Sequence, residues 1–242
     1  MSVYKQTVLG PLWFLIQPLF STLVFTVIFG KIARISTDGL PPVLFYMAGI
    51  VSWNYFATCL TKTSDTFVAN SAIFGKVYFP RLTVPVSVVI TNLITFTIQF
   101  CLFLSFLLYF YINGATVKPS IWIVLTPFLL LQMAALGLGF GILVSALTTK
   151  YRDLTYVVGF GIQLWMYATP VVYPMSQIPQ KWQWLYALNP MVAVVEAFRF
   201  SFLGAGTIQV WYFVSSITVT LTILIIGIIL FSRIEKTFMD TV

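Results

Sequence analysis

The side chains best suited to chemistry or to recognition gather between residues 148 and 199. This stretch opens on a compact charged turn at 150–153, which carries two cations and one carboxylate. It ends on Glu196 and Arg199, which lie three residues apart on one face of a helix and can pair. Two interpretations of that pair stay open: a simple ion pair at the outer rim, or a part in gating.

Several kinds of catalytic and cofactor chemistry have no candidate residues in this sequence. There is no histidine, the commonest metal ligand and general base, and Cys59 and Cys101 each lie inside an apolar run. Neither Gly-Lys pair is followed by Ser or Thr, so neither completes a phosphate-binding loop. We therefore expect no catalytic residue, no metal and no cofactor in this chain. The net charge of +7 is small and spread out, which does not favour a nucleic-acid partner.

The composition is that of an integral membrane protein. The chain is 60% hydrophobic and 8% charged, whereas soluble domains carry roughly 25% charged residues. Charge-free windows recur along it, each long enough for the ~20 residues that a helix needs to cross a bilayer. The predicted fold class is all-α, a single transmembrane domain over residues 1–242. The six expected spans are about 11–31, 43–61, 84–112, 121–148, 154–173 and 209–231.

The segment between the last two spans is predicted to be broken. Pro174, Pro179 and the Asn189-Pro190 pair interrupt it, and residues 191–202 are apolar but too short to cross a bilayer. We expect a re-entrant outer segment that enters the membrane surface and turns back. Such a backbone is tolerated only against protein or a wet cavity.

Glycines mark sites of close helix packing. Gly137, Gly139 and Gly141 lie in an apolar run with no preceding strand, so they do not form a dinucleotide-binding loop. Glycines spaced in this way let a second helix approach closely. We expect the same of Gly159 and Gly161.

The positive charges set an expected orientation. Lysine and arginine divide eight to five between the two faces, which predicts that both termini are cytoplasmic. The longer cytoplasmic loop, 62–81, has apolar residues including Phe67 and Phe74 on an approximate helical stripe and ends at Gly75 and Pro80. It is expected to form a short amphipathic helix. That helix either lies in the lipid interface or docks to a cytoplasmic partner.

Four short motifs in order along the chain resemble those of one transporter family. The family is that of the permease subunits of type 2 ABC exporters, and the resemblance is closest to the branch that exports polysaccharides and polyol phosphates. The motifs are YKQTVLGPLW at 4–13 with Gln17-Pro18, YRDL at 151–154, TPVVYP at 169–174, and LNPM at 188–191. Each motif is weak alone, and the four together at these spacings are specific.

The resemblance implies a homodimer of permeases in a bacterial cytoplasmic (inner) membrane, with two separate ABC ATPase subunits that bind ATP and Mg. The 62–81 helix would be the coupling helix. Residues expected to couple to the ATPase are Leu9, Gly10, Phe67, Phe74, Lys76, Tyr151, Arg152 and Asp153. Outer-gate residues would be Trp182, Trp184, Asn189, Pro190, Glu196 and Arg199. This sequence departs from the family pattern in one place: family members usually carry an amphipathic helix of some twenty or more residues before this stretch, whereas only three residues precede Tyr4 here.

The resemblance implies export of a lipid-linked cell-surface polysaccharide of the O-antigen, capsule or teichoic-acid type, in contact with membrane lipids. The alternatives are an exporter of a small amphipathic compound or drug, and a non-transport membrane scaffold. Aromatic side chains can stack on sugar rings without fixing a register, and Trp165, Tyr167 and Tyr173 are the expected pore residues. The other interpretation of Trp165 and Tyr167 is ordinary packing, and that of Trp182 and Trp184 is an interfacial aromatic belt.

Overall fold

The computed structural model describes residues 10–70, 80, 82–148, 153–206 and 208–239. Every regular element in those ranges is a helix, which agrees with the predicted class. The α-helices are α1 (Trp13–Phe25), α2 (Pro42–Ser64), α3 (Thr66–Ala69), α5 (Thr83–Ile112), α6 (Thr126–Thr148), α7 (Leu154–Tyr167), α8 (Gln180–Ala187), α9 (Pro190–Leu203) and α10 (Val210–Met239). A π-helix, Thr26–Ile32, continues α1, and a 3-10 turn, Ile121–Leu125, precedes α6.

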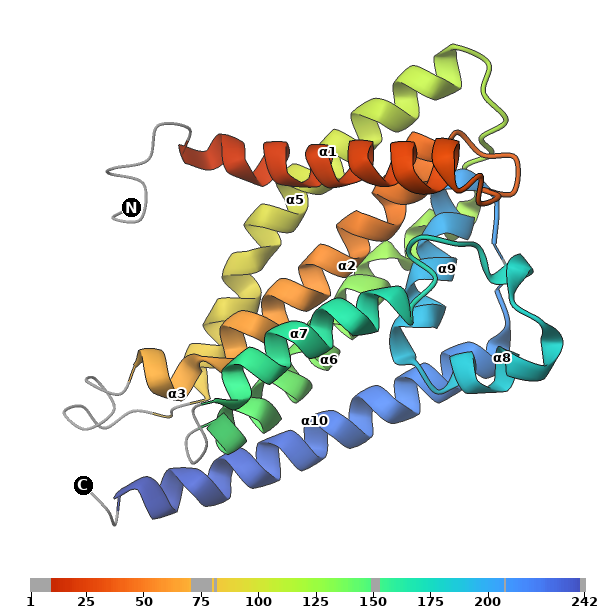
Figure 1. Cartoon of the computed structure of the whole chain (residues 1–242). Coiled ribbons are helices and arrows are strands. Elements are labelled where there is room, and N and C mark those ends of the chain that lie inside the picture. The colour runs from red at the N-terminus through yellow and green to blue at the C-terminus, as the bar shows by residue number, and fades with distance from the viewer. Residues whose placement is uncertain (1–9, 71–79, 81, 149–152, 207, 240–242) are drawn as a thin grey trace.

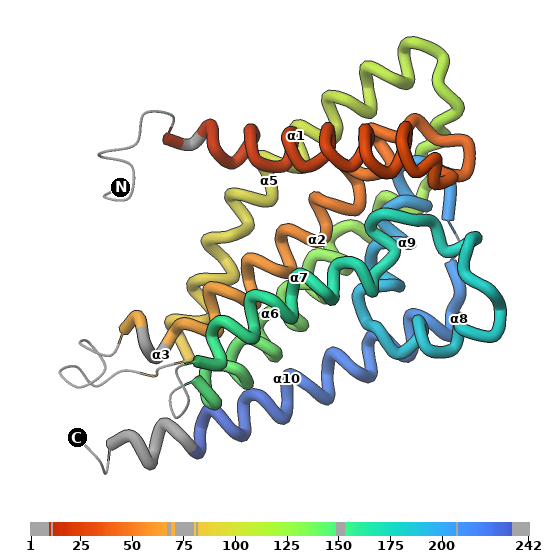
Figure 2. Tube along the Cα trace, in the orientation of Figure 1, coloured from red at the N-terminus to blue at the C-terminus, as the bar shows by residue number. Residues whose placement is uncertain are grey.

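Helix α2 forms the centre of the bundle (Figure 1). Its apolar window is 78% buried, whereas no other long apolar helix in the described ranges exceeds 28%. Helices α1, α5, α6 and α9 all pack against it. Helices α2, α6 and α7 run alongside one another (Figure 2). Helix α3 lies at one end of the bundle, and α8 and α9 lie at the opposite end. The bundle therefore has two distinct ends joined by a buried helix.

Glycines of α6 bring neighbouring helices into close contact, as predicted. A Cβ atom on Gly137 would lie 2.8 Å from Cβ of Cys59, and one on Gly141 would lie 2.5 Å from Cβ of Thr63, both on α2. A Cβ on Gly139 would lie 3.0 Å from the backbone of α10. The expectation for Gly159 and Gly161 of α7 is not met within the chain, because added Cβ atoms there would touch nothing within 4 Å.

Five helices in the described ranges are long and apolar enough to cross a membrane: Trp13–Ile32, Pro42–Ser64, Thr83–Ile112, Ile121–Thr148 and Val210–Arg233. They correspond to five of the six predicted spans. The exception is the expected span at 154–173, because α7 has 14 residues and ends at Tyr167. A helix of that length rises about 21 Å, less than the ~30 Å of hydrocarbon. The helix ends just before Thr169 because Pro170 disfavours a helical conformation in the residue that precedes it.

The segment between α7 and α10 is broken, as the prolines predict. Helix α9 begins at Pro190, where Asn189 accepts a hydrogen bond from the backbone N–H of Met191, and it ends at Gly204, which has φ of 75°. Proline suits the first helical position and glycine the left-handed conformation just past the end. All of its side chains except Phe200 are buried. This 14-residue helix is a core element of the bundle.

Candidate functional site

Most of the described residues proposed for coupling or for the outer gate belong to elements at the two ends of the bundle (Figure 1). One end carries α3 and the start of α7. The other carries α8, α9 and the turn of residues 168–174 that follows α7, here called the reversal. Thr169, Val171 and Val172 of the reversal are buried, so this turn is packed into the core rather than exposed as a loop.

Asn189 ties the end of α7 to the start of α9. Its side-chain oxygen accepts from the indole Nε1 of Trp165 at 3.0 Å and caps α9 through Met191 at 3.1 Å. Its amide nitrogen donates to the carbonyl oxygen of Ala168 at 3.2 Å and to the hydroxyl of Thr169 at 3.0 Å. Every one of these bonds uses a different donor or acceptor position, so the amide is saturated.

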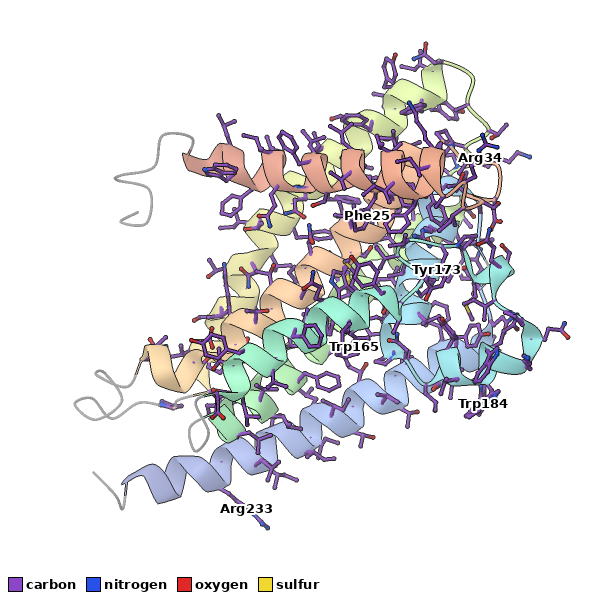
Figure 3. The ribbon with its side chains drawn as sticks, in the orientation of Figure 1. Phe25, Arg34, Trp165, Tyr173, Trp184 and Arg233 are labelled. Atoms are coloured by element: carbon purple, nitrogen blue, oxygen red, sulfur yellow. The ribbon has the colours of Figure 1, made fainter. Side chains whose placement is uncertain are left out.

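Trp165 is half-buried and packs into an aromatic cluster. Its ring centroid lies 5.0 Å from that of Phe56 and 4.9 Å from that of Phe140, both with edge-on geometry. Figure 3 shows the side chain turned toward the body of the bundle. These contacts support the packing interpretation of Trp165, and its role in a pore stays a prediction.

The tyrosines of the reversal and α8 form a hydrogen-bonded pair. The hydroxyl groups of Tyr173 and Tyr186 lie 3.0 Å apart, and the Tyr173 hydroxyl also donates to the carbonyl oxygen of Tyr167 at 2.9 Å. The Tyr167 ring itself is exposed, as are Trp182 and Trp184 on α8. Exposed indoles on a short helix suit both a gate and an interfacial belt.

Glu196 and Arg199 lie in the core. The Arg199 side chain is 1% exposed, and its Nη1 atom is 3.5 Å from Oε1 of Glu196. Nη1 also donates to the carbonyl oxygen of Pro170, and Nη2 donates to that of Val171 at 2.6 Å. The guanidinium carbon lies 3.7 Å from the centroid of the Phe45 ring. The two side chains pair, as their spacing predicts, and both are buried within the chain. The choice between a simple ion pair at the outer rim and a part in gating stays open.

A cavity of about 420 Å³ opens beside the reversal. Trp165, Tyr186 and Asn189 line it, together with residues of α6 and α10. Its lining is mainly apolar, and the polar atoms of Asn189 and the Trp165 nitrogen already bond to each other or to the chain. The described residues contain no group of three or more His, Cys, Asp or Glu side chains placed to hold a metal.

The end of the bundle with α3 is described in part. Gly10 begins the first turn with φ of 44°, a conformation that suits glycine, and Asp153 is exposed at the start of α7. Phe67 lies in α3, which follows α2 after a single residue, Asp65. Burial raises the pKa of the Asp65 carboxyl. Leu9, Phe74, Lys76, Tyr151 and Arg152 lie outside the described residues, so their coupling role stays a prediction.

Sequence reasoning missed a polar seam between α2 and α5. The Lys62 ammonium donates to the Asn92 side chain at 2.9 Å, and Asn54 donates to Gln99 at 3.4 Å. Asn92 and Gln99 are seven residues apart in a charge-free run, which places them on one helical face. That spacing was the available signal, because polar side chains inside membrane helices tend to bond across to a neighbouring helix.

The long apolar helices, the buried central helix and the broken segment define a multi-pass helical membrane protein. The family model for the ABC-2 type transporter matches residues 1–203. The chain therefore belongs to the ABC-2 type transporter family, as the permease component and not as the ATPase. Permeases of this family work with an ABC ATPase subunit.

Curated relatives are similar over most of the chain. The O-antigen export system permease protein RfbA of Klebsiella pneumoniae is 29% identical over 239 residues, covering 98% of this chain and 89% of the relative. A protein of the same name from Myxococcus xanthus is 29% identical over 199 residues, or 81% and 74% of the two chains. The polysialic acid transport protein KpsM of Escherichia coli is 23% identical over 195 residues, or 79% and 72%.

Proposed function

We propose that this chain is the membrane-spanning subunit of an ATP-driven exporter of a lipid-linked cell-surface polysaccharide. The observation that carries the proposal is the similarity to O-antigen export permeases, which extends over nearly the full length of both chains. The fold supports it, since five long apolar helices, α7 and the broken segment account for the chain. The partner ATPases supply the energy and hold ATP and Mg.

The experiment that tests this function removes the gene from the organism that carries it. The expected result is loss of the surface polysaccharide, with its lipid-linked form retained inside the cell. A plasmid copy restores export only when the partner ATPase keeps its phosphate-binding lysine. A changed tolerance to amphipathic drugs with a normal surface polysaccharide would support the small-compound exporter instead. An unchanged drug tolerance together with a normal surface polysaccharide would support a non-transport scaffold.

A homodimer is part of the proposal, and the exposed face of α7 supports it. Tyr156, Phe160 and Leu164 follow one another at four-residue intervals, so they share a face, and all three are exposed. Gly159 and Gly161 on the same helix have open space where a Cβ would be. Helix α1 is similarly uncovered, with 11% of its window buried. We place the seam of the dimer, and the polysaccharide path, along α1 and α7.

The proposed topology has six crossings in the bacterial cytoplasmic membrane, with both termini cytoplasmic. In it, α7 and the reversal together make the fifth crossing, and α8 and α9 form the re-entrant outer segment. The lysine and arginine bias supports this orientation. The placement of α3 and α8 at opposite ends of the bundle (Figure 1) supports assigning them to opposite faces of the membrane.

A thiol-labelling experiment checks the topology. In a background without Cys59 and Cys101, we expect Ser176→Cys to react with an impermeant reagent added to intact cells. Asp153→Cys should react only after the cells are opened, although both positions are exposed in the fold. A permeant reagent serves as the control for both. Labelling of Asp153→Cys from outside would invert the orientation.

The 62–81 loop is the proposed coupling helix for the ATPase. We expect Phe74→Asp to leave membrane insertion intact and lower export about tenfold or more, because a carboxylate costs several kcal/mol in an apolar contact. Phe74→Leu keeps the apolar contact and should export normally. Surface polysaccharide is measured against protein level and ATP hydrolysis. Normal export by Phe74→Asp would mean that this face lies only in lipid.

Tyr167 and Tyr173 are the proposed stacking residues near the outer half of the path. We expect Tyr167→Ala to lower export roughly five-fold and Tyr167→Phe to keep it, because stacking needs the ring and not the hydroxyl. Tyr173→Phe should lower export less than Tyr173→Ala, since it loses the hydrogen bonds to Tyr167 and Tyr186 but keeps the ring. Full export by both alanine variants at normal protein level would exclude stacking.

A further inference from the structure

Arg199 joins three separate parts of the molecule. It belongs to α9, it donates to two consecutive carbonyl oxygens of the reversal, and its flat face covers the Phe45 ring of α2. Gly49, one helical turn beyond Phe45, makes the approach possible. A Cβ atom there would lie 2.9 Å from Nη2 of Arg199 and 3.0 Å from the carbonyl oxygen of Val171.

Stability alone does not account for a cation at this position. Replacing a buried ion pair by apolar residues is often neutral or stabilising, because desolvation offsets the attraction between the charges. The Arg199 Nε atom is buried without a hydrogen-bond partner among the described residues, which adds to that cost. What a guanidinium supplies is geometry: a rigid fork of donors with a flat face, which fixes two carbonyl groups against one ring.

The reversal has little freedom to move independently of Arg199. Thr169, Val171 and Val172 are buried. The carbonyl oxygens of Pro170 and Val171 accept hydrogen bonds from the guanidinium. Asn189 fixes the start of the same turn through Ala168. A shift of α2 at Phe45 and Gly49 therefore reaches the reversal through Arg199 directly.

The opposite end of α2 leads into α3. Helix α2 is continuous over 23 residues, about 34 Å, and only Asp65 separates it from α3. Its second half lies against Gly137 and Gly141 of α6 without space for a Cβ, which leaves the two helices little room to slide past each other. We therefore expect a displacement applied at α3 to be carried along α2 to Phe45.

We propose that Arg199 is a positioning residue that passes the movement of α2 to the reversal, and so sets the opening of the outer segment. The contact between its guanidinium and the Phe45–Gly49 turn of α2 is the joint. This inference rests on the proposed function in one respect, that a partner ATPase moves α3. The inference adds a physical connection between the α3 end of the bundle and the reversal.

The test uses the complex of the full chain with its partner ATPase. Gln177→Cys, exposed in the 3-10 turn Met175–Gln177, reports the state of the outer segment through its rate of labelling, in a background without Cys59 and Cys101. The rate is compared without nucleotide and with ATP plus vanadate. Phe45→Leu removes the ring under the guanidinium. Phe103→Leu is the matched control, equally buried and packed on α9 at Phe198 and Phe202.

In the parent complex, we expect the labelling rates with and without nucleotide to differ roughly five-fold, which is at the low end of the effects seen between coupled sites. Phe103→Leu should keep that ratio. Phe45→Leu should bring it close to one while the protein still assembles with the ATPase. Gly49→Ala, which pushes on the same joint, is the second variant should Phe45→Leu fail to accumulate. Arg199→Lys, which keeps the charge but loses the fork, should behave as Phe45→Leu does.

Two results would overturn the inference: a nucleotide-dependent ratio in Phe45→Leu or Gly49→Ala equal to that of Phe103→Leu, or no nucleotide dependence in the parent complex. The readout needs the ATPase but no polysaccharide. A failure of the polysaccharide assignment would therefore appear in the export assay and leave the labelling ratio unchanged.

Discussion

Gly141→Ala is expected to lose much of its heat stability, although it adds a single methyl group. The new Cβ would lie 2.5 Å from Cβ and 2.8 Å from Cγ2 of Thr63, and 3.0 Å from the carbonyl oxygen of Leu60. None of these atoms is the end of a flexible side chain, so α6 and α2 must separate. Overpacking of this kind costs about 1–3 kcal/mol of unfolding free energy, a large share of a typical total.

Gly159→Ala is the matched control, because a Cβ at that position meets nothing within 4 Å. In a helix, alanine is favoured over glycine by about 1 kcal/mol, so the isolated chain should be as stable as the parent or more so. The measurement is the fraction of the purified monomer that stays monodisperse after heating in detergent. A Gly141→Ala protein as heat-stable as Gly159→Ala would contradict the close packing of α6 on α2.

Asn189→Ala is expected to destabilise the end of the bundle that carries the reversal by about 3 kcal/mol. Loss of a helix cap costs about 1 kcal/mol, and each hydrogen bond lost at a half-buried position costs about 0.5–1.5 kcal/mol more. Both apply, because the Asn189 oxygen caps α9 and accepts from the Trp165 indole. The amide also donates to Ala168 and Thr169, and those bonds are lost as well.

Asn189→Asp separates the acceptor role of this side chain from its donor role. It keeps the acceptor for Met191 and Trp165 and loses the donor to Ala168, so its stability should fall between those of the parent and Asn189→Ala. Trp165→Phe removes the indole donor together with part of the packed ring. A double-mutant cycle between Trp165→Phe and Asn189→Ala should give a coupling of about 1 kcal/mol. Equal heat stability of Asn189→Ala and the parent would exclude this linkage.

Much of the fold follows from where the charges are absent. Five of the six predicted spans are long helices, because an apolar window of sufficient length has one stable conformation in a membrane. The glycines of α6 were interpretable for a similar reason, since a missing Cβ inside an apolar helix is useful only where another helix comes close. Pro190 and Gly204 mark the ends of α9 through local backbone chemistry.

Other features depended on contacts between distant parts of the chain. The end of α7 was marked by Pro170, although its apolar window continues past Tyr167. The position of the turn that follows depends on a distant contact, because the carbonyl of Ala168 bonds to Asn189. The burial of Arg199 is set by Phe45 and Gly49, about 150 residues earlier in the sequence. Local spacing predicted that Arg199 would pair with Glu196, and it carried no information on what would cover them.

The burial of α2 bears on how the protein is assembled in the membrane. Helix α2 enters second, yet it has the lowest mean hydropathy of the five long helices, 1.4, and carries polar side chains such as Asn54. Its partners α6 and α9 are synthesised well over fifty residues later. Until they arrive, α2 has only α1, and then α5, as packing partners within the chain. We therefore expect the nascent chain to need early pairing with those two helices or cellular insertion factors. Substitutions in α2 should therefore cause degradation of newly made protein more readily than slow transport.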